Sequence, residues 1–252
     1  MKALTVDVIE QYPDDYPIVR FLNKEGLLRT LGVESDIPRQ RTDLNPTLLF
    51  RSLNYYRRIE DHRGDRYENQ IITRHPETGA LLSNQNLNTV LVSCWSCYQQ
   101  EDLYTALPWD IFKGSVAVIE STIGEVKKMI NWIAPTPKDV DHAPNAGSLR
   151  ADFTEHGKVI YYTPETDHEA LYGKYQIQSK NCFFKRQVPY SAEKEYRFMI
   201  MFAAHLHFSP EMFCVRLKDT SYITKIHLKN DVFSKVELQA FHAYYHNRIN
   251  ML

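Results

Sequence analysis

The stretch Phe183-Phe-Lys-Arg-Gln-Val-Pro-Tyr-Ser-Ala-Glu-Lys-Glu-Tyr-Arg-Phe-Met-Ile-Met-Phe202 joins a charged segment to an apolar run. Its second half is apolar enough for a strand that is covered on both faces. Glu193 and Glu195 stand two residues apart where this strand begins, so an extended backbone would place both carboxylates on one face. Two carboxylates that close resist ionising together, which is one way a site obtains an acid and a base from the same side chain. The alternative is a solvated strand entry without a chemical role.

The elements expected around this stretch predict an α+β fold, a single domain with a mixed or antiparallel central sheet. Apolar runs predict strands at Thr47–Leu53, Thr89–Trp95, Ser115–Glu120, Lys158–Thr163, Tyr196–Phe202, Met212–Arg216 and Ile223–Leu228. Helical spacing predicts helices at Asp14–Leu31, Glu101–Phe112, Ile123–Ile133 and Phe233–Arg248. Because the strands cluster in the middle and late chain, a regular βαβ alternation is not expected. We expect a helical N-terminal region over residues 1–46, an α+β domain over residues 47–252 and a C-terminal helix.

Composition excludes several classes of protein. The chain has 252 residues, of which 24% are charged and 12% aromatic, so it has the makings of a folded core. A formal net charge of −1 provides no global basic field for nucleic acid. No apolar run approaches the roughly 18 residues of a membrane span, and the N-terminus lacks the apolar centre of a signal peptide. We therefore expect a cytoplasmic protein without a membrane partner, and its four cysteines fit a reducing compartment.

Motifs for metal and nucleotide chemistry give little support. Cys94 and Cys97 have the spacing of a redox site or of half a zinc site, but both lie at or just beyond the end of a strand, and Cys182 and Cys214 are too isolated to complete a zinc site. A structural role is favoured for the pair, and no metal is expected. The chain has no GxxxxGK[ST], GxGxxG or GxSxG motif, so P-loop, Rossmann and hydrolase-elbow chemistry are not indicated.

Three features follow one another in a meaningful order. Arg51 lies on an early strand, Ser121 and Thr122 close a middle strand, and Glu193 and Glu195 open a late one. This order resembles the Arg / Ser-Thr / Glu-x-Glu pattern of ADP-ribosyltransferases. The resemblance implies that Arg51 binds the phosphates of NAD, that Ser121-Thr122 support the nicotinamide, that Glu195 stabilises an oxocarbenium-like state and that Glu193 assists the acceptor. The chemistry is reasonable in itself, because a pyrophosphate suits an Arg fork and a carboxylate stabilises a sugar that develops positive charge.

A second resemblance covers roughly residues 47–202. It is carried by Ser93-Cys-Trp-Ser96, Leu107-Pro-Trp-Asp-Ile-Phe112, Gly114-Ser-Val-Ala-Val118, Gly157-Lys-Val-Ile-Tyr161, Phe184-Lys-Arg186 and Glu193-Lys-Glu-Tyr-Arg197. These segments resemble a bacterial family with a Cys-(Phe/Trp)-Ser strand and a Lys…Glu-x-Glu-x-Arg motif, some of whose members occur in defence or toxin contexts. Trp95 of the Cys-Trp-Ser strand joins the predicted cofactor site.

The two resemblances together imply an NAD-dependent toxin or phage-defence effector that modifies RNA, DNA or protein, with a possible antitoxin partner. The acceptor is expected to contact Lys185, Arg186, Tyr55 and Tyr56. One alternative is a nucleic-acid-binding or nucleic-acid-processing protein, because tyrosines that can stack on bases alternate with cations. The residues on which this alternative depends are Tyr55, Tyr56, Arg57, Arg58, Arg63, Arg66, Tyr67, Lys185 and Arg186. The other alternative is a regulatory interaction module in which the charges form structural ion pairs.

The transferase hypothesis makes two geometric predictions. Arg51, Ser121 and Glu195 should converge on one cleft, because all three would surround a single dinucleotide. The Pro-containing segment Ala134–Thr154 should be a loop that borders this cleft, since long loops often serve sites.

Overall fold

The structure is a computed structural model that describes residues 9–33, 46–58, 70–75, 77–85, 89–98, 106–131, 153–163, 167, 181–202, 212–229 and 232–251. The chain forms two compact units, each built from three segments. The first unit comprises residues 1–12, 50–94 and 135–213, and the second comprises residues 13–49, 95–134 and 214–252. Within the described ranges, no helix is long and apolar enough to cross a membrane.

The first unit is organised around strand β10 (Glu195–Phe202). This strand pairs antiparallel with β7 (Phe153–Lys158) and also pairs with β5 (Thr89–Ser96), whose residues up to Cys94 belong to this unit. Strand β2 (Thr47–Ser52) pairs antiparallel with β5 through Arg51 and Ser52. The other elements are α2 (Leu53–Arg58), the antiparallel pair β3 (Gln70–Arg74) and β4 (Leu81–Gln85), the parallel pair β8 (Ile160–Tyr162) and β9 (Phe184–Arg186), α7 (Gln187–Tyr190) and the 3₁₀ turn η3 (Ser191–Glu193).

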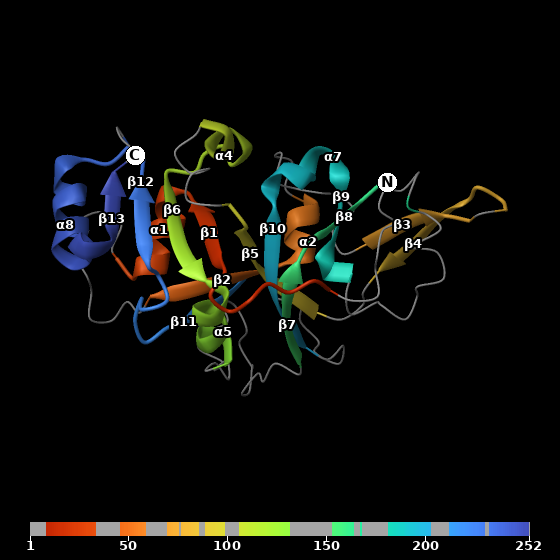
Figure 1. Ribbon diagram of the computed structural model, residues 1–252, viewed down its shortest axis with the longest axis horizontal. Coiled ribbons are helices and arrows are strands. Elements are labelled where there is room, and N and C mark those ends of the chain that lie inside the picture. The colour runs from red at the N-terminus through yellow and green to blue at the C-terminus, as the bar shows by residue number, and fades with distance from the viewer. Residues whose placement is uncertain are drawn as a thin grey trace. The chain divides into compact units, whose positions relative to one another are not determined.

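The second unit holds a run of neighbouring strands in which β6 lies between β1 and β12, and β13 follows β12 (Figure 1). Its strands are β1 (Pro17–Leu22), β6 (Ala117–Thr122), β12 (Lys225–Leu228), β13 (Ile249–Met251) and most of β11 (Met212–Arg216). Its helices are α1 (Lys24–Leu31), α4 (Ala106–Ile111), α5 (Ile123–Asn131), α8 (Lys235–Tyr245) and the 3₁₀ turn η4 (His246–Arg248). The β1–β6 and β6–β12 pairs are antiparallel, and β12–β13 is parallel.

Strand β10 is buried on both faces, as its apolar sequence predicts. On one face Met199 packs in a core cluster with Leu53, Val90, Val92, Tyr162 and Phe183, among others. On the other face Tyr196 and Phe198 contact the ring of His156 on β7. The N-terminal segment passes so close to β7 that a Cβ on Gly157 would lie 2.1 Å from Cγ2 of Ile9, so only glycine fits there.

The predicted α+β class, with a mostly antiparallel sheet, is confirmed. The predicted helix Asp14–Leu31 is wrong in its first half, because Pro17–Leu22 form strand β1 and the helix begins only at Lys24. The spacing of Ile18, Phe21 and Leu22 fits a helix face, but six register pairs with β6 decide for the strand.

Other predicted bounds need smaller corrections. Strand β6 begins two residues after the expected Ser115, and the expected strand Lys158–Thr163 is divided between β7 and β8. The C-terminal helix Phe233–Arg248 begins later and ends in a 3₁₀ turn. The pairs formed by β3, β4, β9 and β13 were not predicted. Of the expected loop Ala134–Thr154, residues 134–152 lie outside the described residues.

Candidate functional site

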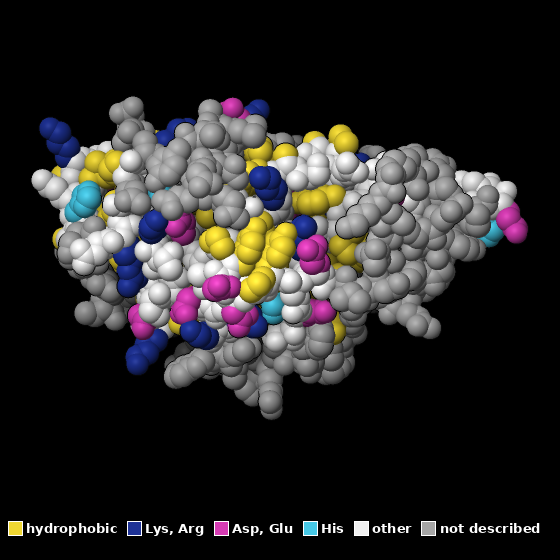
Figure 2. All heavy atoms as spheres, in the orientation of Figure 1, with side chains coloured by type: hydrophobic (Ala, Val, Ile, Leu, Met, Phe, Trp, Pro, Cys, Tyr) yellow, Lys and Arg dark blue, Asp and Glu magenta, His cyan; other side chains and the backbone are white. Residues whose placement is uncertain are grey.

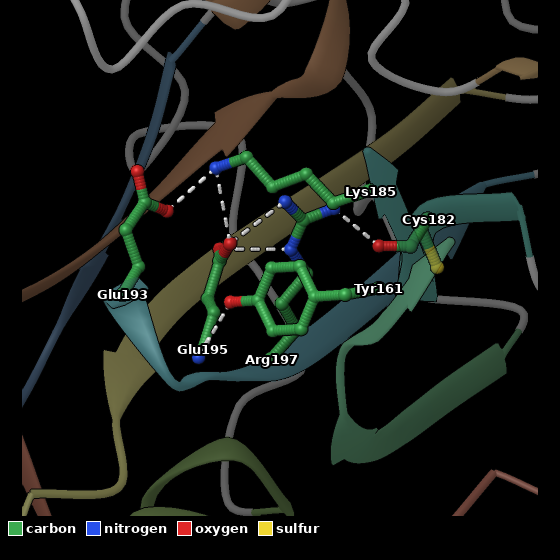
Figure 3. Close-up of polar contacts among 6 residues, drawn as sticks. All are labelled: Tyr161, Cys182, Lys185, Glu193, Glu195 and Arg197. Carbon is green, nitrogen blue, oxygen red and sulfur yellow. Dashed lines mark hydrogen bonds and ion pairs between the residues drawn. The ribbon is translucent and has the colours of Figure 1, made fainter. Parts of the chain in front are cut away.

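The candidate site is a buried cluster of charges at the start of β10 (Figure 3). Arg197 holds the Glu195 carboxylate at both oxygens, with Nε donating to Oε1 at 2.8 Å and Nη2 donating to Oε2 at 3.0 Å. The third guanidinium nitrogen, Nη1, donates to the carbonyl oxygen of Cys182. Glu195 is 4% exposed and Arg197 is 1% exposed. The pair is therefore a desolvated, bidentate ion pair whose geometry is fixed by both partners.

A single ammonium group joins the two carboxylates. Lys185 Nζ lies 2.7 Å from Glu193 Oε2 and 3.3 Å from Glu195 Oε2. The Lys185 side chain is buried, and its Nζ also lies 4.6 Å from the centre of the Tyr190 ring. The Glu193 side chain, at 12% exposure, is the more accessible of the two carboxylates. The cluster thus has an inner carboxylate and one nearer the surface, both bound to the same cation.

The local backbone structure explains why Glu193 and Glu195, although close in sequence, differ in their surroundings. Glu193 ends the 3₁₀ turn η3, and Lys194 then adopts a left-handed conformation with φ 46° before β10 begins. This turn separates Glu193 from the strand, so the two carboxylates are not on one strand face as the spacing predicted. They approach each other through Lys185, which lies on the neighbouring β9. Tyr161 on β8 fixes the strand start, because the backbone N–H of Glu195 donates to its hydroxyl oxygen at 2.9 Å.

The charges of the cluster determine which groups are ionised. Burial alone would raise the pKa of Glu195, but the Arg197 guanidinium and the Lys185 ammonium outweigh burial and hold this pKa well below its usual range. Burial, and then the charge of Glu195, raise the pKa of the Tyr161 hydroxyl far above its usual value. The site therefore holds an ionised inner carboxylate and a neutral phenol at pH 7.

Cys94 also contacts the inner carboxylate. Burial, followed by the charge of Glu195, raises the pKa of its thiol. Cys94 is thus a neutral thiol and not a reactive thiolate. The Glu195 carboxylate accepts three charge-assisted hydrogen bonds, from Arg197 Nε to Oε1 and from Arg197 Nη2 and Lys185 Nζ to Oε2. Its charge is therefore fully engaged by two cations.

Arg51 lies on the same face of the sheet as Glu195. It is the register partner of Val92 on β5, and residues directly opposite each other in an antiparallel pair share a face. Cys94 is two residues further along β5 and so lies on that face too, where its thiol meets Glu195. The Arg51 guanidinium is half-buried and stacks on the Tyr55 ring, 4.2 Å from its centre.

Ser121, Thr122 and Trp95 belong to the second unit, where contacts within that unit engage each of them. Ser121 Oγ donates to the carbonyl oxygen of Tyr222 at 2.6 Å, and Thr122 Oγ1 accepts from the backbone N–H of Glu125 at 3.3 Å. Thr122 therefore caps α5. Trp95 is 1% exposed and packs edge-on against Tyr222.

The residues expected to bind the acceptor, Lys185, Arg186, Tyr55 and Tyr56, are all described, whereas the side chains of the further residues of the nucleic-acid-binding alternative are not. Tyr55 and Tyr56 contact each other edge to face at 5.8 Å, and the Arg186 guanidinium lies 5.8 Å from the centre of the Tyr190 ring. The side chains of Arg57 and Arg58, and all of Arg63, Arg66 and Tyr67, lie outside the described residues. Figure 2 shows basic and acidic side chains interspersed on the face that it presents.

The chain was compared with protein-family models, curated proteins and solved structures, and none of them matches.

The structure brings Lys185, Glu193 and Glu195 together as one cluster and adds Arg197, which was not among the predicted site residues. The signal for Arg197 was present, because Glu195 and Arg197 are two residues apart on a strand and so share a face.

Proposed function

We propose that this protein is an ADP-ribosyltransferase-like enzyme that uses NAD⁺, and that its substrate meets the Glu193 end of the cluster. The observation that carries the proposal is the buried Lys185 ammonium shared by Glu193 and Glu195, at 2.7 and 3.3 Å. Fixed charges in a buried site need no rearrangement during a reaction, and such preorganisation is the main source of electrostatic catalysis. The position of Arg51 on the same face of the sheet suits a group that binds the phosphates of NAD⁺.

The proposed reaction is a substitution at the anomeric carbon of the nicotinamide ribose. The bond between that carbon and the nicotinamide nitrogen breaks, and nicotinamide leaves with the electron pair. The Glu193 carboxylate faces the positive charge that develops on the sugar. A nucleophilic atom of the acceptor then forms the new bond, and its proton passes to Glu193 or to solvent.

Within this proposal Glu195 has a positioning role. Two cations hold its carboxylate through three hydrogen bonds, and at 4% exposure it is poorly accessible to a ribose hydroxyl. Its ionised charge holds Lys185, and Lys185 in turn orients Glu193. The sequence assigned the central catalytic role to Glu195, whereas we place Glu193 against the substrate.

The setting of the reaction is part of the proposal. A macromolecular acceptor, whether RNA, DNA or protein, would contact the cation and ring surfaces of Arg186, Tyr55 and Tyr56. A toxin or phage-defence role in the cytoplasm, with an antitoxin partner, remains the setting that we propose. Within the described residues, Cys94, Cys97 and Cys182 are thiols and not disulfide partners, which supports a reducing compartment.

A second candidate function is a non-enzymatic interaction module. It is favoured by the buried, bidentate pairing of Glu195 with Arg197, because such a pair needs no substrate to explain it. Under this interpretation Lys185 and Glu193 complete a structural network, and neither NAD⁺ nor nucleic acid binds.

The experiment that separates the two candidates measures nicotinamide release from NAD⁺ by purified protein, with and without cell extract. Calorimetric titrations with NAD⁺ and with a short RNA run beside it. We expect release by the wild type and a loss of about 10²–10³-fold in Glu193→Gln, as for one electrostatic contact to a transition state. Gln187→Glu, a change at an exposed neighbouring position, serves as the control and should leave release unchanged. No NAD⁺ binding by a folded wild-type protein would exclude the transferase.

A further inference from the structure

Among the residues that the structure describes, two buried hydrogen-bond donors of the second unit have no partner. Within the described residues, Nη1 of Arg20 and the hydroxyl of Tyr222 are buried polar atoms to which no group bonds. Both residues border the same indole: the Arg20 guanidinium lies 5.8 Å from the centre of the Trp95 ring, and the Tyr222 ring lies 6.5 Å from it. A buried donor that is left unpaired loses its hydrogen bonds to water without replacement, so two such donors around one ring call for an explanation.

Both unpaired groups are available as hydrogen-bond donors. Arg20 Nη2 donates a hydrogen bond to the carbonyl oxygen of Leu49 at 3.0 Å, so Nη1 remains available as a donor. Burial raises the pKa of the Tyr222 hydroxyl, so this group keeps its proton and is also available as a donor. A guanidinium N–H and a phenol O–H that border the same indole complement an acceptor that carries lone pairs and no hydrogen.

The charge around Arg20 favours a negatively charged acceptor. The guanidinium is half-buried, and among the residues that the structure describes it has no carboxylate partner. A cation withdrawn from water without a counter-charge is stabilised strongly by an anion. Arg20 therefore supplies the positive charge and Tyr222 the second donor of an anion site.

We propose that Arg20 and Tyr222 bind one oxyanion, a carboxylate or phosphate group, beside Trp95. All three residues belong to the second unit, so the proposal is independent of the transferase function proposed for the cluster in the first unit. A buried water is the competing occupant. It would accept from both donors, but it would bring two hydrogens of its own that need acceptors.

The test follows thermal unfolding of the full chain in sodium phosphate, sodium acetate and sodium chloride at one fixed ionic strength, after overnight equilibration because both donors are buried. A ligand that binds only the folded state raises the melting temperature in a saturable way. We expect saturation with phosphate or with acetate, and the arm that saturates identifies the anion. Chloride should give no such curve.

Tyr222→Phe is the decisive variant, because it removes only the hydroxyl and keeps the ring against Trp95. We expect it to raise the half-saturating anion concentration at least tenfold, while its melting temperature in chloride is no lower than that of the wild type. The matched control is Tyr245→Phe, since the Tyr245 hydroxyl already donates a hydrogen bond to the carbonyl oxygen of Leu31 at 2.9 Å. This control should melt lower in every salt and keep the wild-type anion response.

Two results would overturn the proposal. The first is a wild-type melting temperature that rises with phosphate and acetate only linearly, as general salting effects do, and equally in Tyr222→Phe. The second is a Tyr222→Phe protein that melts lower than the wild type in all three salts, which would assign the space to a structural water.

Discussion

Arg197 donates two hydrogen bonds, of 2.8 and 3.0 Å, to the carboxylate of Glu195, which lies two positions earlier on the same strand. Both side chains are almost completely buried. The pair therefore forms part of the core of the first unit as well as the inner wall of the candidate site. Substitutions here should change folding and chemistry together, so stability must be measured beside activity.

Glu195→Gln should destabilise the protein by about 3–5 kcal/mol, because it leaves two buried cations without their shared carboxylate. Glu193→Gln should cost less, since its side chain is nearer the surface and its loss leaves Lys185 paired with Glu195. Urea unfolding at pH 7, followed by circular dichroism, gives both free energies. Equal losses in the two variants would contradict the inner and outer roles assigned to these carboxylates.

The contribution of Glu195 to stability should disappear at low pH. Its pKa is lower in the folded state than in the unfolded chain, so its contribution is fully present above its ordinary pKa of about 4.3 and is lost as pH falls below that value. The difference in unfolding free energy between the wild type and Glu195→Gln should therefore be constant from pH 7 to pH 5 and narrow towards pH 3. A difference that does not change over this range would show that the pKa of Glu195 is not lowered by folding.

Arg197→Lys should lower the free energy of unfolding strongly, although the substitution keeps the positive charge. A lysine keeps the charge but cannot bond both oxygens of Glu195 and the carbonyl oxygen of Cys182 at once. We expect a loss of more than about 2 kcal/mol, in the range of broken buried networks. Arg186→Lys is the control, because Arg186 is only half-buried and lies over the Tyr190 ring. A comparable loss in both variants would show that the fork geometry of Arg197 is unimportant.

Thr122 offers a separate test of the Ser-Thr motif. Its hydroxyl caps α5, so Thr122→Ala should lower the free energy of unfolding by about 1 kcal/mol and Thr122→Ser should restore it. If the motif also supports nicotinamide, as the transferase proposal requires, nicotinamide release should fall in Thr122→Ala by more than its stability explains. Release that follows only the folded fraction would limit Thr122 to its capping role.

Much of this architecture could be predicted from the sequence because it is local. The cap of α5 depends on residues three positions apart, and the apolar run of β10 indicates burial on both faces. The association of Lys185, Glu193 and Glu195 could also be anticipated, since all lie within one short stretch. What the sequence could not supply is register. Contacts of Glu195 with Cys94 and Tyr161 depend on which residues of β5 and β8 lie beside β10, and no local pattern encodes that.

The same limit explains the error at β1. Its apolar residues satisfy both a helical and an extended pattern, and only pairing with β6 and β5 selects the strand. The separate environments of Glu193 and Glu195 were missed for a different reason. The left-handed Lys194 breaks the strand geometry between them, and a lysine carries no sequence signal for that conformation.

The last prediction compares two ion pairs of equal length and unequal burial. Lys185–Glu193 and Lys127–Asp14 both have nitrogen–oxygen distances of 2.7 Å, but their side-chain exposures are 5% and 12% in the first pair and 32% and 66% in the second. A double-mutant cycle with Lys185→Met and Glu193→Gln should give a coupling energy of about 1.5–3 kcal/mol, as for contacting groups in one buried network.

The control cycle, with Lys127→Met and Asp14→Asn, should give only about 0.2–1 kcal/mol. In 1 M sodium chloride the screening length falls to about 3 Å, so the exposed coupling should vanish while the buried coupling persists. Urea unfolding of the wild type and the six variants, at low salt and in 1 M sodium chloride, measures both coupling energies directly. Two couplings that are equal and equally sensitive to salt would mean that water reaches Lys185, and the preorganised charge on which the proposed chemistry depends would then be absent.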